Sequence, residues 1–227
     1  MTEAPASLYL HEVVDIVGRG AAPYMAHVVG FDSAAVADRS LRLVGTWEVV
    51  GTTGRWPQVV NLWEIVGGWD GWRRLCDCTN VSKAANAELA TWWDEAYRHR
   101  TGGFDRVLAA APGCPTLDQL LAGGVRGSLF VHELTRVAQG AGDEYLTAVV
   151  DEWAPVIEQY GHRLVHASSV QWRDDEVCTV WSTDLDGHIA LQQAPEPAGW
   201  AKRRRALTTR WHEELMTPGA GTPLARG

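Results

Sequence analysis

Two histidines at equivalent places in the chain are the side chains best suited to proton transfer. His11 and His132 lie 121 positions apart, and each is followed by a glutamate, which is Glu12 in the first case. A half-buried imidazole titrates near neutral pH and serves as a general acid or base. The alternative is a structural role, in which the two histidines are hydrogen-bonded to each other.

Two tyrosines and a third histidine extend this set. Tyr24 and Tyr145 are again 121 positions apart, each at the expected start of a helix, where the N-terminus orients a phenol or an anionic ligand. His27 follows Tyr24 by three residues and so shares its helix face. Packing of the tyrosines is the alternative. We predict a catalytic set of His11, Tyr24 and His27, and substrate contacts from Glu12, His132 and Tyr145.

Tryptophan is unusually abundant, with 12 Trp against 3 Phe. Trp is bulky and amphipathic, so it lines cores, interfaces and pockets for flat apolar ligands. Core packing accounts for most of these residues. Trp47 and Trp63 are predicted to bind substrate as the walls of a pocket, and the expected ligand is a small apolar or aromatic molecule.

The recurring spacing indicates an internal duplication. A shift of 121 positions places Ser7–Val13 on Ser128–Leu134 and Arg42–Val44 on Arg163–Val165. Further on, the register slips by three and Thr91–Glu95 falls on Thr209–Glu213. We therefore expect two units, 7–111 and 128–227, joined by a linker over 112–127.

Each unit is predicted to have the order β-α-β-β-α-β, the ferredoxin-like arrangement of an α+β fold. The expected strands are 8–16, 42–50, 58–65 and 104–110 in the first unit, with helices over 23–39, 69–75 and 84–100. In the second unit, strands are expected at 129–137, 162–172 and 176–183, helices at 143–160 and 197–215, and a fourth strand in 216–225.

The segments Leu43-Val44-Gly45-Thr46-Trp47 and Val59-Val60-Asn61-Leu62-Trp63-Glu64 resemble the NIPSNAP family of dimeric α+β barrel proteins. That family shows an LVGYW strand followed by an NxVxHLWxY strand, often in tandem units. This chain has Asn61 where the pattern has His, and by the 121-residue shift Trp47 and Trp63 fall on Ser168 and Asp184. The resemblance implies two four-stranded sheets from one chain closing into a barrel, as a pseudo-dimer. This superfamily hosts many chemistries, so the fold does not give the function.

Several classes are disfavoured by composition. A net charge of −8 argues against binding of nucleic acid, and the basic run Lys202–Arg205 is interpreted as a solvated helix face. No stretch of 18 apolar residues predicts a membrane span, and no targeting segment is recognised, so we expect a cytoplasmic protein. No metal or cofactor is expected, and a homodimer is left open.

These features predict a small-molecule enzyme that uses cofactor-independent acid–base chemistry, as an isomerase, cyclase or lyase, on an apolar or aromatic carbonyl-bearing metabolite. The first unit is expected to be the working half, because His27, Trp47 and Trp63 occur only there by the 121-residue shift. One alternative is a non-catalytic ligand-binding or interaction protein of the NIPSNAP type. Another is a haem- or oxygen-dependent enzyme, with haem-ligand candidates His27, His99 and His212.

Overall fold

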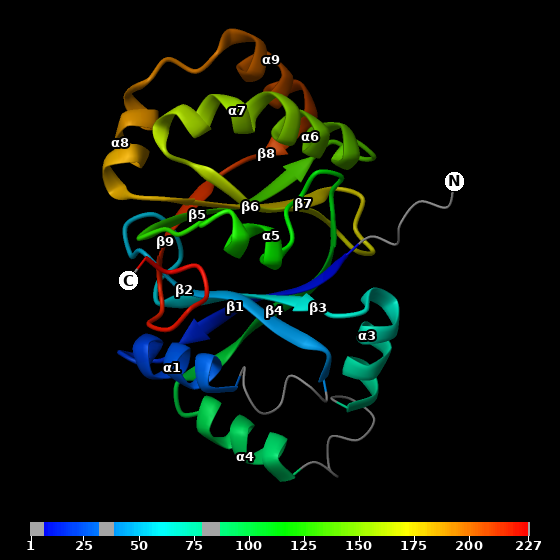
Figure 1. Cartoon of the computed structure of the whole chain (residues 1–227), viewed down its shortest axis with the longest axis vertical. Coiled ribbons are helices and arrows are strands. Elements are labelled where there is room, and N and C mark those ends of the chain that lie inside the picture. The colour runs from blue at the N-terminus through cyan, green and yellow to red at the C-terminus, as the bar shows by residue number, and fades with distance from the viewer. Residues whose placement is uncertain (1–6, 32–38, 79–86, 227) are drawn as a thin grey trace. The chain divides into compact units, whose positions relative to one another are not determined.

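The computed structural model describes residues 7–31, 39–78 and 87–226, which divide into two compact units (Figure 1). Unit 1 runs to Val107 and includes Pro218–Pro223 from the C-terminal part of the chain. Unit 2 runs from Leu108 to Thr217 and includes the residues from Leu224 onward. The predicted ends of the helices over 23–39 and 84–100 fall partly outside the described residues.

Unit 1 contains an antiparallel sheet in the order β4-β1-β3-β2. β1 (Leu8–Ile16) pairs with β3 (Gln58–Ile65), and β3 pairs with β2 (Leu41–Val49). β4 (Arg100–Ala110) begins in this unit beside β1. Helices α1 (Ala21–Phe31) and α4 (Ala87–Ala96) cover one face of the sheet, and α3 (Gly68–Cys76) follows β3 (Figure 1).

The sheet of unit 2 is built around β5 (Leu129–Val137). On one side β5 pairs with β7 (Glu176–Thr183), which pairs with β6 (Arg163–Val170). On its other side it pairs with β8 (Thr208–Arg210) and β9 (Glu213–Pro218). The end of β4, from Leu108, pairs with β6.

One face of this second sheet is covered by helices (Figure 1). The helical segments of unit 2 are α5 (Leu117–Ala122), α6 (Gly142–Ala148), the π-helical turn η3 (Val149–Trp153), α7 (Ala154–Ile157), the 3-10 turn η4 (Glu158–Tyr160), α8 (Leu185–Gln193) and α9 (Ala198–Leu207). Both units therefore follow the order β-α-β-β-α-β, which confirms the predicted α+β, ferredoxin-like fold class.

The C-terminal part of unit 2 differs from the prediction. The helix expected over 197–215 ends at Leu207. The fourth strand, expected in 216–225, is formed by β8 and β9 and shares only 216–218 with the predicted segment. Residues 213–216 have good intrinsic helix formers, but β5 offers them an open edge, and Leu215 pairs there with Val131. The expected match of Thr91–Glu95, which lie in α4, with Thr209–Glu213 is therefore wrong.

The register between the two units also differs from the prediction. Leu8 lies opposite Ile65 in unit 1, and Leu129 lies opposite Thr183 in unit 2, so the third strands are offset by 118 positions. The connection before β7 is three residues shorter than that before β3, since 171–175 replaces 50–57. Trp63 consequently corresponds to Trp181 and not to Asp184. The expectation that this tryptophan is confined to the first unit is wrong.

A glycine in β2 has no room for a side chain. Gly45 lies at an irregularity in the β2–β3 register, and a Cβ there would come within 2.0 Å of the ring of Trp47, which is fully buried. We expect Gly45→Ala to lower the free energy of unfolding by about 1–3 kcal/mol, because the ring must leave its packed position. Urea denaturation measures this change. Gly30→Ala is the control, since nothing lies within 4 Å of a Cβ at that helical site, and equal losses in the two variants would contradict the prediction.

Within the described part of the chain, none of the helices has both the length and the apolar character that crossing a bilayer requires.

Candidate active site

A cavity of about 510 Å³ lies within unit 2, between the covered face of its sheet and the helices. This volume is in the usual range for small-molecule sites. Strands β5, β7 and β9 contribute residues to its lining, as do η3, α7 and α9. The lining residues that matter for chemistry are Glu133, Trp153, His162, Trp181, Trp200, Arg204, Trp211 and Glu213.

The walls of this cavity are rich in indole rings. Trp153 and Trp200 stack with their ring centres 5.1 Å apart and their planes 5° from parallel. Trp153 belongs to the π-helical turn η3, and such turns are frequent at functional sites because they redirect side chains of a helix. Trp181 is buried on β7, whereas Trp211 follows β8 and is partly exposed. These rings form a flat, apolar enclosure.

Glu133 is a buried carboxylate held by donors from both sides. Alternation along β5 turns it toward the cavity with Val131, while its neighbour His132 takes the opposite face. Thr179 lies directly across from it on β7 and donates a hydrogen bond to Oε2. Trp181 Nε1 also donates to Oε2 at 2.9 Å, and Trp211 Nε1 donates to Oε1 at 2.7 Å. Three donors fix the position of this carboxylate.

Glu213 is the direct cross-strand partner of Glu133 in the β5–β9 pair. Burial and the neighbouring charge of Glu133 raise the pKa of Glu213 to about 7. A hydrogen bond from Gln192 and the charge of Arg204 lower this pKa, but they only partly offset the increase. Gln192 Nε2 donates to Oε1 at 2.7 Å, and His188 Nε2 lies 3.7 Å from the same oxygen. A carboxyl group that titrates near neutral pH inside a cavity is a marker of a functional site.

The cationic group of the cavity is already engaged. The Arg204 guanidinium forms two hydrogen bonds with Glu196, of 3.1 Å to Oε1 and 3.4 Å to Oε2, and its central carbon lies 4.6 Å from the centre of the Trp211 ring. His162 also lines the cavity. Burial, and to a lesser extent the nearby His188, lowers the pKa of His162 to about 4. This imidazole is therefore neutral at physiological pH.

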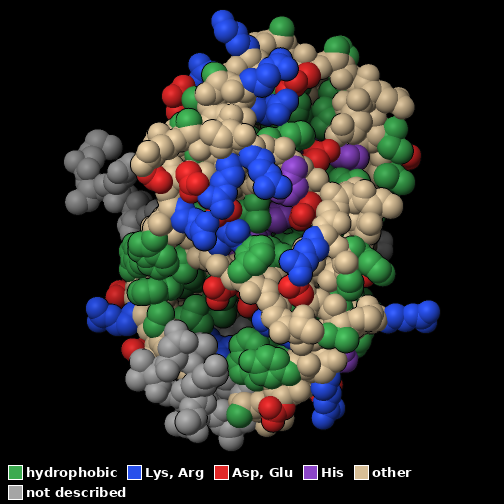
Figure 2. Space-filling model, turned by 180° about the vertical axis from the view of Figure 1, so that it is seen from behind, with side chains coloured by type: hydrophobic (Ala, Val, Ile, Leu, Met, Phe, Trp, Pro, Cys, Tyr) green, Lys and Arg blue, Asp and Glu red, His purple; other side chains and the backbone are tan. Residues whose placement is uncertain are grey.

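The basic run Lys202–Arg205 lies on α9, and two of its arginines are paired with acids. Arg203 lies 3.3 Å from Glu152, and Arg204 is bound to Glu196. Figure 2 shows Lys and Arg side chains interspersed with Asp and Glu at the end of unit 2 that carries α9. The run is therefore a mixed-charge surface rather than a separate basic patch.

In unit 1, several of the predicted site residues belong to one hydrogen-bonded network. The Tyr24 hydroxyl accepts a hydrogen bond from Asn61 Nδ2 at 3.2 Å, and burial together with Glu12 raises the pKa of Tyr24. Asn61 Nδ2 and Trp63 Nε1 both donate to Glu12 Oε2, at 3.1 and 2.9 Å. The pair Glu12–Trp63 is the counterpart of Glu133–Trp181 in unit 2.

The remaining predicted residues of unit 1 are placed differently. His11 on β1 and Trp47 on β2 are fully buried. His27 donates through Nε2 to the backbone oxygen of Trp92 at 3.1 Å, if that nitrogen carries the proton, and its ring stacks on Trp92 at 4.8 Å. The structure therefore brings Tyr24 together with Glu12 and Trp63, and positions His27 in the contact between α1 and α4.

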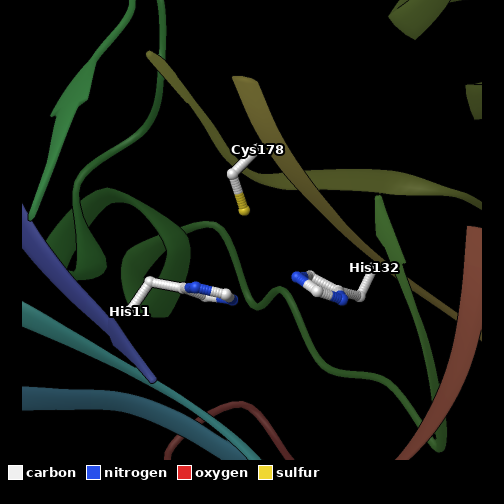
Figure 3. A group of neighbouring side chains, drawn as sticks. All are labelled: His11, His132 and Cys178. Carbon is white, nitrogen blue, oxygen red and sulfur yellow. The ribbon is translucent and has the colours of Figure 1, made fainter. Parts of the chain in front are cut away.

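His132 and Tyr145, the two substrate-binding residues predicted in unit 2, do not line the cavity. His132 Nδ1 lies 3.4 Å from Glu214 Oε2, on the sheet face opposite to Glu133. Figure 3 shows His132 on β5 and Cys178 on β7 projecting to the same side of this sheet. Tyr145 is buried behind the cavity wall, with its ring centre 6.2 Å from that of Trp200.

No family model matches the chain, and no curated protein matches it. Solved structures do match. A protein proposed to be a monooxygenase from Fusobacterium nucleatum is 6% identical, with a TM-score of 0.63 over 95% of this chain and 94% of that one. A second, from Lactobacillus acidophilus, is 7% identical, with a TM-score of 0.63 over 94% of each chain. An anthrone oxidase-like protein is 12% identical, with a TM-score of 0.62 over 98% of this chain and 97% of that one.

The chain shares the mixed α+β, ferredoxin-like fold of these structures. At these identities the similarity concerns the fold, and membership of the NIPSNAP family stays a prediction. The expectation of a cofactor-independent isomerase, cyclase or lyase is wrong. The similar structures are described by oxidative activities, a monooxygenase and an anthrone oxidase, which agree instead with the oxygen-dependent alternative.

Haem does not fit the residues of this cavity. None of the candidate ligands His27, His99 and His212 lines it, and His162 is the single imidazole among its lining residues. Haem also carries two propionates, which need cationic partners, whereas Arg204 is bound to Glu196 and the neighbouring charged groups are the carboxyls of Glu133 and Glu213. We therefore assign no step to haem.

Sequence reasoning missed Glu213, Arg204 and Trp211, because residues 197–215 were interpreted as one helix. It missed Trp181 because the shift of 121 positions was applied to the third strands as well, although the connection between β6 and β7 is three residues shorter than that between β2 and β3. A shift of 118 from residue 58 onward aligns Trp63 with Trp181 and would have identified the repeated pair of glutamate and tryptophan.

Proposed function

We propose that this protein is an oxygen-dependent enzyme that oxidises an aromatic substrate in the cavity of unit 2. In this proposal Glu213 is the base that removes a proton from the substrate. The observation that carries the proposal is the adjacent pair of carboxyl groups, buried Glu133 and half-buried Glu213, in which the pKa of Glu213 is raised to about 7 inside a cavity walled by tryptophan.

The chemistry requires a substrate with a weakly acidic C–H group, such as a CH₂ next to aromatic rings. A base with a pKa near the operating pH combines a useful deprotonated fraction with enough basicity to accept the proton. Loss of the proton leaves an electron pair on carbon, and such an electron-rich carbanion reduces O₂. Glu133, held in place by its three donors, lies beside Glu213, and its charge contributes to the raised pKa of Glu213.

The atoms balance for anthrone as substrate. Its CH₂ carbon loses both hydrogens, one oxygen atom of O₂ becomes the new carbonyl oxygen, and the other leaves as water. The product is anthraquinone, and one O₂ is consumed for each anthrone. The proton taken by Glu213 returns to the departing oxygen as this water forms.

Two further observations support the proposal. The indole walls formed by Trp153, Trp181, Trp200 and Trp211 suit a flat polycyclic molecule. The structures similar in fold include proteins proposed to be monooxygenases and an anthrone oxidase-like protein. A small aromatic molecule remains the proposed partner.

An oxygen electrode tests this function with anthrone as the probe. We expect the purified protein to accelerate oxygen uptake above the uncatalysed rate, with one O₂ consumed for each anthraquinone formed. Glu152→Gln is the matched control, because Glu152 is exposed and lies outside the cavity lining, and it should retain the wild-type rate. The proposal fails if neither anthrone nor hydroxylated anthrones accelerate oxygen uptake.

The NIPSNAP resemblance is retained as a proposal about ancestry. Its two segments, Leu43–Trp47 and Val59–Glu64, are paired in the β2–β3 hairpin. A non-catalytic binding protein of that type would bind an aromatic ligand without consuming oxygen, so the same electrode experiment separates the two functions.

A further inference from the structure

We infer that the unit 2 cavity selects its ligand by charge and by hydrogen bonding. It takes a neutral aromatic molecule that carries a hydrogen-bond donor at its edge, and it rejects the same ring system when the edge carries an anion. The inference deepens the proposed function and rests on it for the identification of this cavity as the substrate site.

Acidic groups outnumber basic groups around the cavity. Three carboxyl groups line it, those of Glu133, Glu196 and Glu213, against one guanidinium. That guanidinium, of Arg204, is bound to both oxygens of Glu196 and lies over the ring of Trp211. An incoming anion therefore meets Glu133 and Glu213 without a cation to compensate it, unless it displaces Glu196.

One carboxyl oxygen of Glu213 is available to accept a hydrogen bond from a ligand. Gln192 donates to Oε1, whereas none of the described residues donates a hydrogen bond to Oε2. The oxygens of Glu133, in contrast, already accept bonds from Thr179, Trp181 and Trp211. A ligand with an O–H, N–H or acidic C–H group supplies the missing donor to Glu213, and an ether or a hydrocarbon leaves this acceptor unpaired.

The surroundings of these charged groups are largely apolar. Indole rings line the cavity beside the carboxyl pair, and apolar surroundings reduce the screening between charges. Like charges brought together at such a place strongly disfavour binding, and an unpaired polar group there is also costly. The discrimination should therefore be large enough to measure with simple probes.

Three naphthalene derivatives of the same ring size separate the two effects. 2-Naphthol is a neutral donor, 2-methoxynaphthalene is neutral without a donor, and 2-naphthoate is an anion at pH 7. By isothermal titration calorimetry we expect 2-naphthol to bind at least about 10-fold more tightly than 2-naphthoate. Its Kd should also be several-fold lower than that of 2-methoxynaphthalene.

Two variants assign the discrimination to named groups. Glu196→Gln weakens the hold on Arg204 and should reduce the preference for 2-naphthol over 2-naphthoate. Glu213→Gln removes the negative charge and replaces an acceptor by an amide, so it should reduce both preferences. Thermal unfolding of each variant verifies that it is folded.

The inference is overturned if 2-naphthoate or 2-methoxynaphthalene binds the wild-type protein as tightly as 2-naphthol, or if no probe binds. Its failure is distinguishable from that of the proposed function. Oxygen uptake with anthrone but no discrimination among the probes removes the inference alone. Discrimination without oxygen uptake by any anthrone removes the oxidative function and leaves a selective binding cavity.

Discussion

Replacing Glu213 by glutamine is expected to lower kcat for anthrone oxidation by about 10²–10⁴-fold, the usual contribution of a general base. Glutamine has nearly the same shape and retains an oxygen that accepts the hydrogen bond from Gln192. It has no basic oxygen to take the proton, however. Because the Trp walls are unchanged, KM should stay within a few-fold of the wild-type value.

Steady-state oxygen uptake measures both constants for this variant. Glu214→Gln is the matched control, since Glu214 is the next residue on β9 but turns to the other face of the sheet, where it lies 3.4 Å from His132. The control should keep kcat within a few-fold of wild type. A Glu213→Gln variant that retains half of the wild-type kcat would show that another group removes the proton.

Glu133→Ala is expected to produce the largest loss of stability among substitutions in the cavity. It removes the common acceptor of Thr179 and Trp181, both of which are buried. Leaving a buried donor without a partner costs about 1–3 kcal/mol for each group. Trp211 is partly exposed, so its indole N–H finds water and adds less to the loss.

Chemical denaturation followed by circular dichroism measures this loss. Glu133→Gln is the companion variant, because its amide oxygen still accepts a hydrogen bond, and it should be destabilised less than Glu133→Ala. If Glu133→Ala unfolds at the same urea concentration as wild type, the three hydrogen bonds to Glu133 do not stabilise the fold.

The order of elements was predictable from local patterns. The apolar, β-prone composition of 8–16 and 129–137, together with the repeated Ser-Leu and His-Glu pairs, identified β1 and β5 as equivalent first strands. These signals are local and periodic, so a single sequence carries them. The fourth strand of unit 2 was not predictable in this way, because residues 213–216 become a strand through pairing with the edge of β5.

The candidate site depended on such long-range pairing throughout. Glu133 and Glu213 are 80 positions apart in sequence, and only the β5–β9 register makes them neighbours. The β5–β7 register places Trp181 beside Glu133. This register differs by three residues from the one that the 121-residue repeat predicts, because the connection before β7 is shorter. Sequence reasoning therefore emphasised the histidines, whose chemistry is visible residue by residue. It underestimated two glutamates whose chemistry depends on their being adjacent.

The most direct test of the account is the pH dependence of kcat/KM for anthrone oxidation, after subtraction of the uncatalysed rate. Burial and Glu133 raise the pKa of Glu213 to about 7, and Glu213 must be deprotonated to act as a base. We therefore expect kcat/KM to rise with pH to a plateau, with a midpoint near pH 7. In Glu133→Gln the midpoint should move to lower pH, because the neighbouring negative charge is gone. A profile that is flat between pH 5 and pH 9, or a midpoint unchanged in Glu133→Gln, would contradict it.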